Sequence, residues 1–334
     1  MTRFLLTLIT GLFISCALVA GPDAGEDKMG MSLFDRWMSD AETRIELHVN
    51  FDSLEVYRRK TASLPARVVQ DGQTLDLEVT VRGRFRRRTC SMPPLKLQFK
   101  KSGLRALGLN THNDFKLVTH CTDDAAGQEA LVREQLAYEL YRTVHPAASL
   151  RTQLLTVTYV NTADGSTTTS YAILIEDIDE LKNRLNAKNC DDCYALPAAA
   201  VSNAESLVLF QYMIGNSDFS TRAIRNTKLV DLPTGSKVFI PYDFDYSGLV
   251  NADYATGVSH LNETRVTDRT LLWEFETTPD FGAAAQHLTD LKETLLAQVA
   301  DHPYLSAGGK REVSKYLKGF YRELRAGTLT TLAK

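Results

Sequence analysis

The sequence predicts an α+β protein of two lobes, a β-rich N-terminal lobe and a mainly helical C-terminal lobe. Between residues 43 and 121 apolar side chains recur at every second position, which is typical of strands with one buried face. After residue 203 the apolar spacing becomes helical, with only two short strands, 227–230 and 237–240, between the helices. The length of 334 residues, with 44% hydrophobic and 24% charged residues, is enough for two folded units.

The first 21 residues predict an export signal. Arg3 precedes an uncharged apolar stretch from Phe4 to Val19, and the small residues Ala20 and Gly21 offer a cleavage point. The stretch is short for a helix that spans a membrane, so cleavage is favoured over a retained anchor. Lipid attachment through Cys16 is a third, less favoured alternative. We therefore predict an exported chain, periplasmic or secreted, with no transmembrane segment in its mature part.

The remaining chain divides by its changing periodicity. Residues 22–44 form an extension with a short helix within 30–42, residues 45–176 form the β-rich lobe, and residues 177–334 form the helical lobe. The predicted strands are 45–49, 64–69, 75–81, 95–99, 115–118, 154–159 and 171–175. The predicted helices are 128–144, 203–214, 282–300 and 309–325.

Four cysteines remain after the predicted signal: Cys90, Cys121, Cys190 and Cys193. An even number in an exported chain favours disulfides. We prefer the pairs Cys90–Cys121 and Cys190–Cys193 over a four-cysteine zinc site, because the chain has one CxxC motif and lacks a second.

The most informative polar residues lie between Asp218 and Asp245. Asp218 and Asn226 follow a predicted helix, whereas Asp243 and Asp245 come directly after the apolar strand Val238 to Ile240. Acids at the mouth of a buried strand need a counter-charge, and oxygen ligands of this kind suit Mg²⁺ carried on phosphates, with Mn²⁺ as the alternative. Phosphoryl transfer is thus the first hypothesis, although Asp and Asn also favour turns for purely structural reasons.

Four further residues are candidates for nucleotide binding. Arg82, beside Gly83, offers a bidentate donor to phosphate, or forms part of a solvated basic turn. Lys96 faces away from the apolar side of its strand, toward either a nucleotide cleft or water. Glu134 could pair with that lysine or face solvent, and Glu176 could touch the nucleotide or simply end a strand.

The order of these motifs resembles the atypical kinases of the spore-coat protein H (CotH) type, in an exported bacterial branch. The resemblance runs through Arg82-Gly83-Arg84, Leu95 to Phe99, Leu131 to Glu134, Ala172 to Asp177, Gly215 to Asp218 and Pro241 to Asp245. It implies a two-lobed protein-kinase-like fold that binds ATP and Mg²⁺. It further implies that Lys96 contacts the phosphates, Asp218 is the catalytic acid and Asp243 binds metal. Asn226 fits the pattern less well, since it lies farther from Asp218 than the protein-kinase spacing.

Two hypotheses follow for the function of the protein and for the molecules that it binds. The first is an exported kinase that transfers phosphate from ATP to a protein or another hydroxyl acceptor of the cell envelope. The second is a pseudokinase or a cell-envelope protein that binds an anionic ligand without turnover. The formal net charge of −3 gives no general attraction to nucleic acid, and the sequence does not indicate an oligomeric state.

Overall fold

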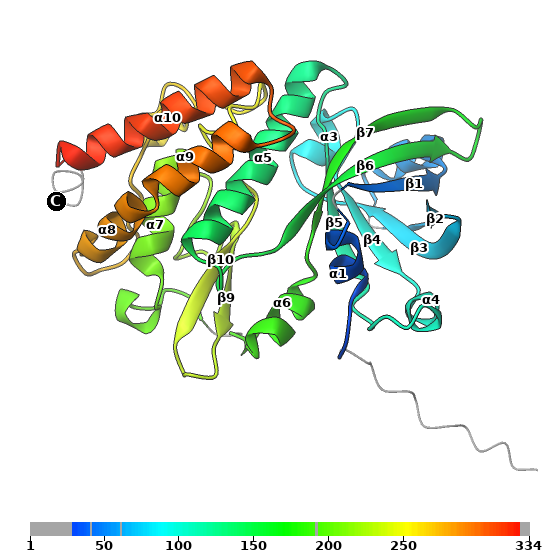
Figure 1. Ribbon diagram of the computed structural model, residues 1–334, viewed down its shortest axis with the longest axis horizontal. Coiled ribbons are helices and arrows are strands. Elements are labelled where there is room, and N and C mark those ends of the chain that lie inside the picture. The colour runs from blue at the N-terminus through cyan, green and yellow to red at the C-terminus, as the bar shows by residue number, and fades with distance from the viewer. Residues whose placement is uncertain (1–28, 41, 61, 191–192, 328–334) are drawn as a thin grey trace, which may run out of the picture.

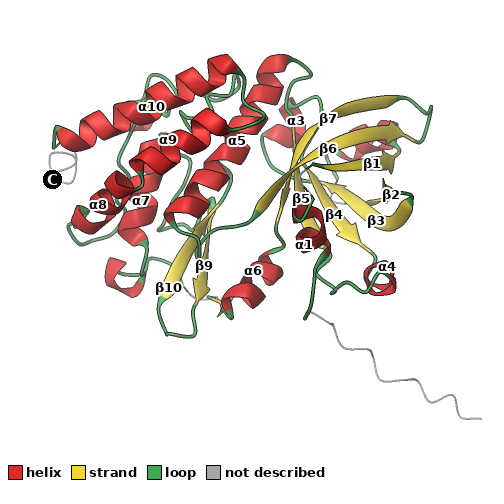
Figure 2. Ribbon diagram, in the orientation of Figure 1, coloured by secondary structure: helices red, strands yellow, loops and turns green. Residues whose placement is uncertain are grey.

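The computed structural model describes residues 29–327 except 41, 61, 191 and 192. A β-barrel occupies one side of the molecule and a layer of helices the other (Figure 1). Figure 2 shows the same segregation by secondary structure. The predicted signal peptide and Cys16 lie outside the described residues. Among the residues that are described, no helix combines the length and the apolar character needed to cross a membrane.

The barrel contains seven strands in the order β1-β2-β3-β4-β5-β7-β6. Their bounds are β1 Thr43–Val49, β2 Leu64–Gln70, β3 Gln73–Val81, β4 Leu95–Phe99, β5 Asp114–Thr119, β6 Thr152–Asn161 and β7 Thr167–Ile175. Neighbouring strands are antiparallel except β1 and β6, which pair in parallel from Thr43 beside Leu155 to Val49 beside Asn161. A closed ring with an odd number of strands must contain such a parallel pair, because strand directions cannot alternate all the way round.

Side chains alternate along each barrel strand between the interior and the outer surface. The barrel interior is packed with the apolar set of β1 to β7. Helix α1 (Leu33–Met38) adds Phe34 and Trp37 to this core, where the Trp37 ring meets Phe99 at 6.0 Å. Ser32 and Asp35 form a capping box that starts α1. The predicted N-terminal extension is therefore part of the barrel core.

Three short helices lie in the segments that connect barrel strands: α2 Phe51–Tyr57, α3 Arg86–Thr89 and α4 Lys101–Ala106. The sequence did not predict any of the three. Asp71 and Gly72 form the tight β2–β3 turn, both with positive φ, as the Asp-Gly signal indicates.

The long helix α5 (Ala125–Val144) lies between the barrel and the remaining helices (Figure 1). Asp124 caps its first turn, and it ends just before Pro146. Its buried residues belong to one continuous core with residues of α7, β10 and α10. The other elements of this half are α6 Ile178–Leu185, α7 Ala204–Ile214, α8 Gly282–Asp290, α9 Lys292–Asp301, α10 Ala307–Arg325, and the sheet β8 Lys188–Asn189, β9 Thr227–Asp231 and β10 Lys237–Pro241.

The predicted two-lobed, protein-kinase-like fold class is wrong. The β-rich part is a closed, mixed seven-stranded barrel rather than an open N-lobe sheet, because the parallel β1–β6 pair removes the free edges. Helix α5, predicted within the β-rich lobe, shares the core of the helical layer instead. Individual strands and helices were predicted from local periodicity, whereas closure depends on pairing between segments about 110 residues apart.

Both disulfide predictions are confirmed. Cys90 is bonded to Cys121 across 31 residues, and Cys190 is bonded to Cys193 across three. The first bridge joins the end of α3 to the chain that follows β5, so it holds the arginine-rich segment against the barrel.

Candidate functional site

The site is a cavity of about 680 Å³ where the barrel meets the helical layer. Its volume lies within the range of small-molecule sites. The barrel contributes the end of β3, the segment leading into α3 and part of β5, while the loops after α7 and β10 form the opposite wall. The lining residues that carry charge or an amide are Arg82, Arg84, Arg86, Asp218, Arg225, Asn226, Asp243 and Asp245.

Asp218 and Asn226 are held together by their own loop. Helix α7 ends at Gly215, whose φ of 63° requires the left-handed conformation that glycine adopts at low cost. The Asn226 side-chain amide donates a hydrogen bond to Asp218 Oδ2 at 3.0 Å. The Tyr242 N–H donates to the Asn226 carbonyl at 3.0 Å, which ties this loop to the end of β10. The sequence-predicted pair is therefore assembled at one wall of the cavity.

Asp243 follows β10 after one intervening residue. Its φ of 67° lies in the left-handed region, which aspartate adopts more readily than most residues other than glycine. Its N–H donates to the Tyr138 hydroxyl of α5 at 2.9 Å, so the backbone is held while the side chain borders the cavity. Among the described residues, the Asp243 carboxylate has no hydrogen-bond or ion-pair partner.

Asp245, two residues further on, lies in a different environment. It is 4% exposed, accepts a hydrogen bond from the Tyr254 hydroxyl at 3.0 Å, and lies 3.8 Å from Arg86 Nη1. The Asp243 and Asp245 side chains therefore differ in availability. Asp243 is open to a ligand, whereas Asp245 belongs to a buried ionic cluster.

Arg86 is the centre of that cluster, and the sequence did not single it out. Its guanidinium donates to Glu134 Oε2 at 3.0 Å and also to the Thr119 carbonyl, and both charged side chains are at least nine-tenths buried. Glu134 thus pairs with Arg86 instead of Lys96. The buried position of Arg86 in an Arg-rich stretch has no local sequence signal, because the run Arg86-Arg87-Arg88 predicts a solvated surface equally well.

The pKa values of these groups shift according to their burial. Burial raises the pKa of the Asp218 carboxyl; Arg225 opposes this and the Asp243 charge adds to it. Burial also raises the pKa of Asp245, with the charges of Asp243 and Glu134 acting in the same direction. Burial alone would lower the pKa of Arg86, but Glu134 and Asp245 hold it above its usual range. Arg86 therefore remains positively charged beside these acids.

Arginines form the opposite side of the cavity. The Arg82 side chain is half-buried and the Arg84 side chain is exposed, and neither forms a hydrogen bond or ion pair with another described residue. Gly83 between them has a φ of 86°, which allows the sharp turn out of β3. Two unpaired guanidiniums thus border the same space as the unpaired Asp243 carboxylate.

Lys96 lies outside the cavity lining. Its ammonium pairs with Asp114 at 2.6 Å, and its side chain is 40% exposed. Lys116 lies beside Lys96 on the adjacent strand β5 and contacts Tyr242, a residue of the cavity lining. Lys116 packs over the Tyr242 ring at 4.9 Å, and burial, together with Arg82 and Lys228, lowers its pKa to about 8. The alternation in Phe115-Lys116-Leu117 was the signal that could have identified it.

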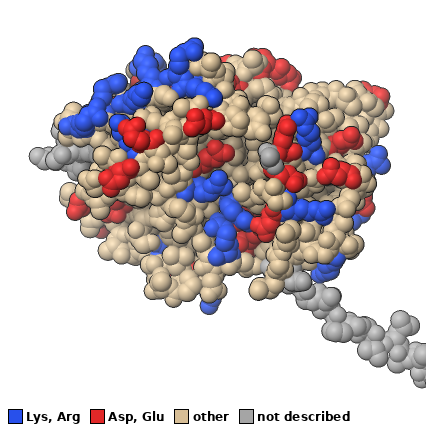
Figure 3. Space-filling model, viewed as in Figure 1, with Lys and Arg blue, Asp and Glu red and all other residues tan. Residues whose placement is uncertain are grey.

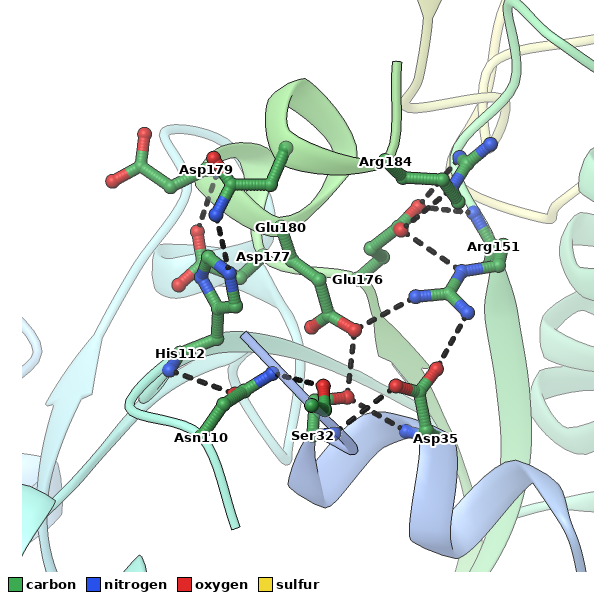
Figure 4. Close-up of polar contacts among 12 residues, drawn as sticks. Ser32, Asp35, Asn110, His112, Arg151, Glu176, Asp177, Asp179, Glu180 and Arg184 are labelled. Carbon is green, nitrogen blue, oxygen red and sulfur yellow. Dashed lines mark hydrogen bonds and ion pairs between the residues drawn. The ribbon is translucent and has the colours of Figure 1, made fainter. Parts of the chain in front are cut away.

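Glu176 is remote from the cavity lining and belongs to a second ionic network (Figure 4). Arg151 Nε donates to its carboxylate at 2.8 Å, and Arg184 Nη2 donates to it at 3.0 Å. Arg151 continues to Asp35 of α1 and to Glu180 of α6, each at 2.7 Å. Arg151 therefore links α1 and α6 to Glu176 at the end of β7, and Arg184 of α6 binds the same carboxylate.

The acids do not form a preassembled metal cage. In the part of the chain that the structure describes, the one close group of three metal-type ligands is Cys190, Cys193 and Asp231, and its cysteines are joined in a disulfide. Asp218, Asp243 and Asp245 are farther apart than such a group requires. Mg²⁺ keeps several waters and is commonly bound by one or two carboxylates plus substrate phosphates, so an open arrangement fits an ion that arrives on phosphate.

No protein-family model matches the sequence, and a search of curated proteins finds no match. The resemblance to CotH-type kinases therefore stays a prediction.

Proposed function

We propose that this cavity binds a magnesium–nucleoside triphosphate, ATP in the first instance, and transfers its terminal phosphate to a hydroxyl acceptor. The observation that carries the proposal is the pairing of unpartnered opposite charges across one cavity, with Arg82 and Arg84 on one side and Asp243 on the other. Arginine offers forked donors to phosphate oxygens, and a free carboxylate is an oxygen ligand for Mg²⁺. The proposal does not depend on a kinase fold.

Each residue of the site would have a separate role in the reaction. Arg82 and Arg84 bind phosphate oxygens, and Lys116 adds positive charge beside Tyr242. Asp243 and Asn226 would hold the metal, whose charge offsets that developing on the transferred phosphate. Asp218 accepts the proton of the acceptor hydroxyl as its oxygen bonds to phosphorus and the bond to the leaving diphosphate breaks. The raised pKa of Asp218 favours this role because it makes the carboxylate a stronger base.

The second candidate is binding of an anionic ligand without turnover. It is favoured by the open spacing of the acids, since unpaired arginines alone are sufficient to hold phosphate or carboxylate groups. Magnesium dependence separates the two candidates, because an arginine-only site needs no divalent ion.

The decisive experiment is calorimetric titration with ATP, with MgCl₂ or with EDTA, followed by transfer of radiolabelled phosphate to the chain itself or to casein. We expect binding that requires magnesium. We expect Asp243→Asn to weaken it about tenfold, and Asp218→Asn to retain binding but lose transfer by at least about 100-fold. Asp301→Asn, an exposed acid of α9, is the matched control. ATP binding that is unchanged in EDTA would favour the second candidate, and no ATP binding under either condition would contradict the first.

A further inference from the structure

Helix α10 separates its charges by sign, and this feature is independent of the cavity. Its inner face buries Val313, Leu317, Phe320 and Tyr321 in the helical core. The helix forms one long outer edge of the molecule (Figure 1), so the opposite face is open to the surroundings along its length.

Both glutamates of α10 are neutralised by arginines of the body. Glu312 pairs with Arg133 of α5 at 2.7 Å, and Glu323 pairs with Arg269 at 3.0 Å. Glu323 also accepts a hydrogen bond from the Tyr212 hydroxyl at 2.9 Å. Each acid of the helix is therefore paired with an arginine of the body.

Five exposed basic residues, here called the basic stripe, follow the outer face: Arg311, Lys315, Lys318, Arg322 and Arg325. They recur at alternating intervals of four and three residues, which places them on one side of a helix. At 1.5 Å per residue, the stripe is about 21 Å long. Figure 3 shows blue side chains gathered along this edge. No ion pair joins a basic-stripe side chain to another described residue, although the charge of Lys318 acts on the exposed Glu293 of α9. Five positive charges therefore lie along one helix of a chain whose net charge is −3.

We propose that the basic stripe docks this protein on an anionic phospholipid bilayer. A straight row of charges on an outer edge can meet a flat surface at all five points, whereas a chain that reads single-stranded nucleic acid also needs aromatic rings for stacking. The exposed large apolar residues of the described chain are Met29, Met31, Val56, Phe85 and Tyr194, and none lies on α10. The contact is therefore electrostatic and peripheral, without insertion.

The expected strength of binding to the bilayer supports reversible docking. Each lysine or arginine near an anionic surface strengthens binding about fivefold, so five together give a gain of about three orders of magnitude at low salt. Screening shortens the reach of exposed charges as ionic strength rises, so the bound fraction should fall steeply with added NaCl.

The test is co-sedimentation of the full chain with vesicles of phosphatidylcholine containing about one third phosphatidylglycerol, compared with pure phosphatidylcholine. The triple variant Lys315→Glu/Lys318→Glu/Arg322→Glu removes the centre of the stripe. The matched control is Arg59→Glu/Arg67→Glu/Lys188→Glu, which reverses three exposed basic residues elsewhere. We expect the stripe variant to lose at least about 100-fold in partition coefficient and the control to stay within about threefold of the native chain.

Three results would overturn the proposal. Equal binding to neutral vesicles would mean that apolar contact drives the association. An equal loss in both triple variants would mean that overall charge, not the stripe, is responsible. Binding to duplex DNA with no binding to anionic vesicles would assign the stripe to nucleic acid. Thermal unfolding of each variant checks that the fold is intact. We expect unchanged unfolding temperatures, because all six substituted side chains are exposed.

Discussion

Arg86 and Glu134 form a buried ion pair of 3.0 Å although 48 residues separate them along the chain. The pair joins the arginine-rich segment after β3 to the middle of α5, directly beneath the candidate site. The Asp245 carboxylate lies 3.8 Å from the same guanidinium, so Arg86 is the counter-charge of both Glu134 and Asp245.

Arg86 and Glu134 should contribute to stability as a coupled pair. Arg86→Met leaves Glu134 and Asp245 buried without a cation, and Glu134→Met leaves Arg86 with Asp245 alone. We expect each to lower the free energy of unfolding by about 3–5 kcal/mol. The double variant removes both charges of the pair but still leaves Asp245 without its cation, so its loss should be smaller than the sum of the two single losses. Urea unfolding of the four proteins tests this. Additive losses would show that the pair is not coupled.

The two disulfides should differ in their contribution to stability. Crosslinking a loop of 31 residues restricts the unfolded chain more than crosslinking one of three. On loop entropy alone, Cys90→Ser/Cys121→Ser should cost about 4 kcal/mol and Cys190→Ser/Cys193→Ser about 2 kcal/mol. The measurement is the urea midpoint of each oxidised protein. A larger loss from the second variant would contradict the ranking.

Lys116, and not Lys96, should be the lysine that matters for nucleotide binding. Lys116→Met removes a cation packed on Tyr242 at the site, whereas Lys96→Met breaks only a half-exposed pair with Asp114. We expect the first to raise the Kd for magnesium–ATP about tenfold and the second to change it less than twofold. Titration calorimetry decides between them, and the reverse ranking would restore the sequence-based assignment of Lys96.

If Asp218 acts as the base, the transfer rate should fall as the pH drops through its raised pKa, because the protonated carboxyl cannot accept a proton. Arg225, whose Nε lies 3.5 Å from the carboxylate, opposes that rise. Arg225→Gln should therefore move the acidic limb of the pH–rate profile to higher pH. Arg222→Gln, an exposed arginine of the same loop, is the control and should leave the limb in place. A shift toward lower pH would argue against Asp218 as the base.

The Glu180 side chain should make stability fall as the pH rises from about 5 to 8. Burial raises its pKa from an ordinary value of 4.5 to about 7, although Ser32 and Arg151 oppose the rise. Between those two values the folded chain holds a proton that the unfolded chain has released, so raising the pH favours unfolding. The stability of the native chain relative to Glu180→Gln should therefore be about 2 kcal/mol lower at pH 8 than at pH 5. A pH-independent difference would contradict this reading.

Local patterns in the sequence were sufficient to locate most strands, the helix α5 and the acids of the site, whereas the number of cysteines gave the Cys90–Cys121 pair across 31 residues. Period-two and helical spacing reveal which face of a segment is buried, and the strand before Asp243 and Asp245 is uninterruptedly apolar. These features depend on neighbours within a few residues, and for that reason they can be predicted without knowing the fold. The CotH resemblance added the expected order of motifs but led to the wrong fold class.

Tertiary structure alone decided the features that need distant partners. The parallel pairing of β1 with β6 closes the barrel, and the approach of the loop after β10 puts Tyr242 against Lys116. Two separate ionic networks pair Glu134 with Arg86 and Glu176 with Arg151. The physical reason is that a charged side chain can be buried only where the packed chain supplies its counter-charge. The sequence contains several arginines and lysines that could supply this counter-charge. Which of them does so depends on which remote segments pack together in the fold.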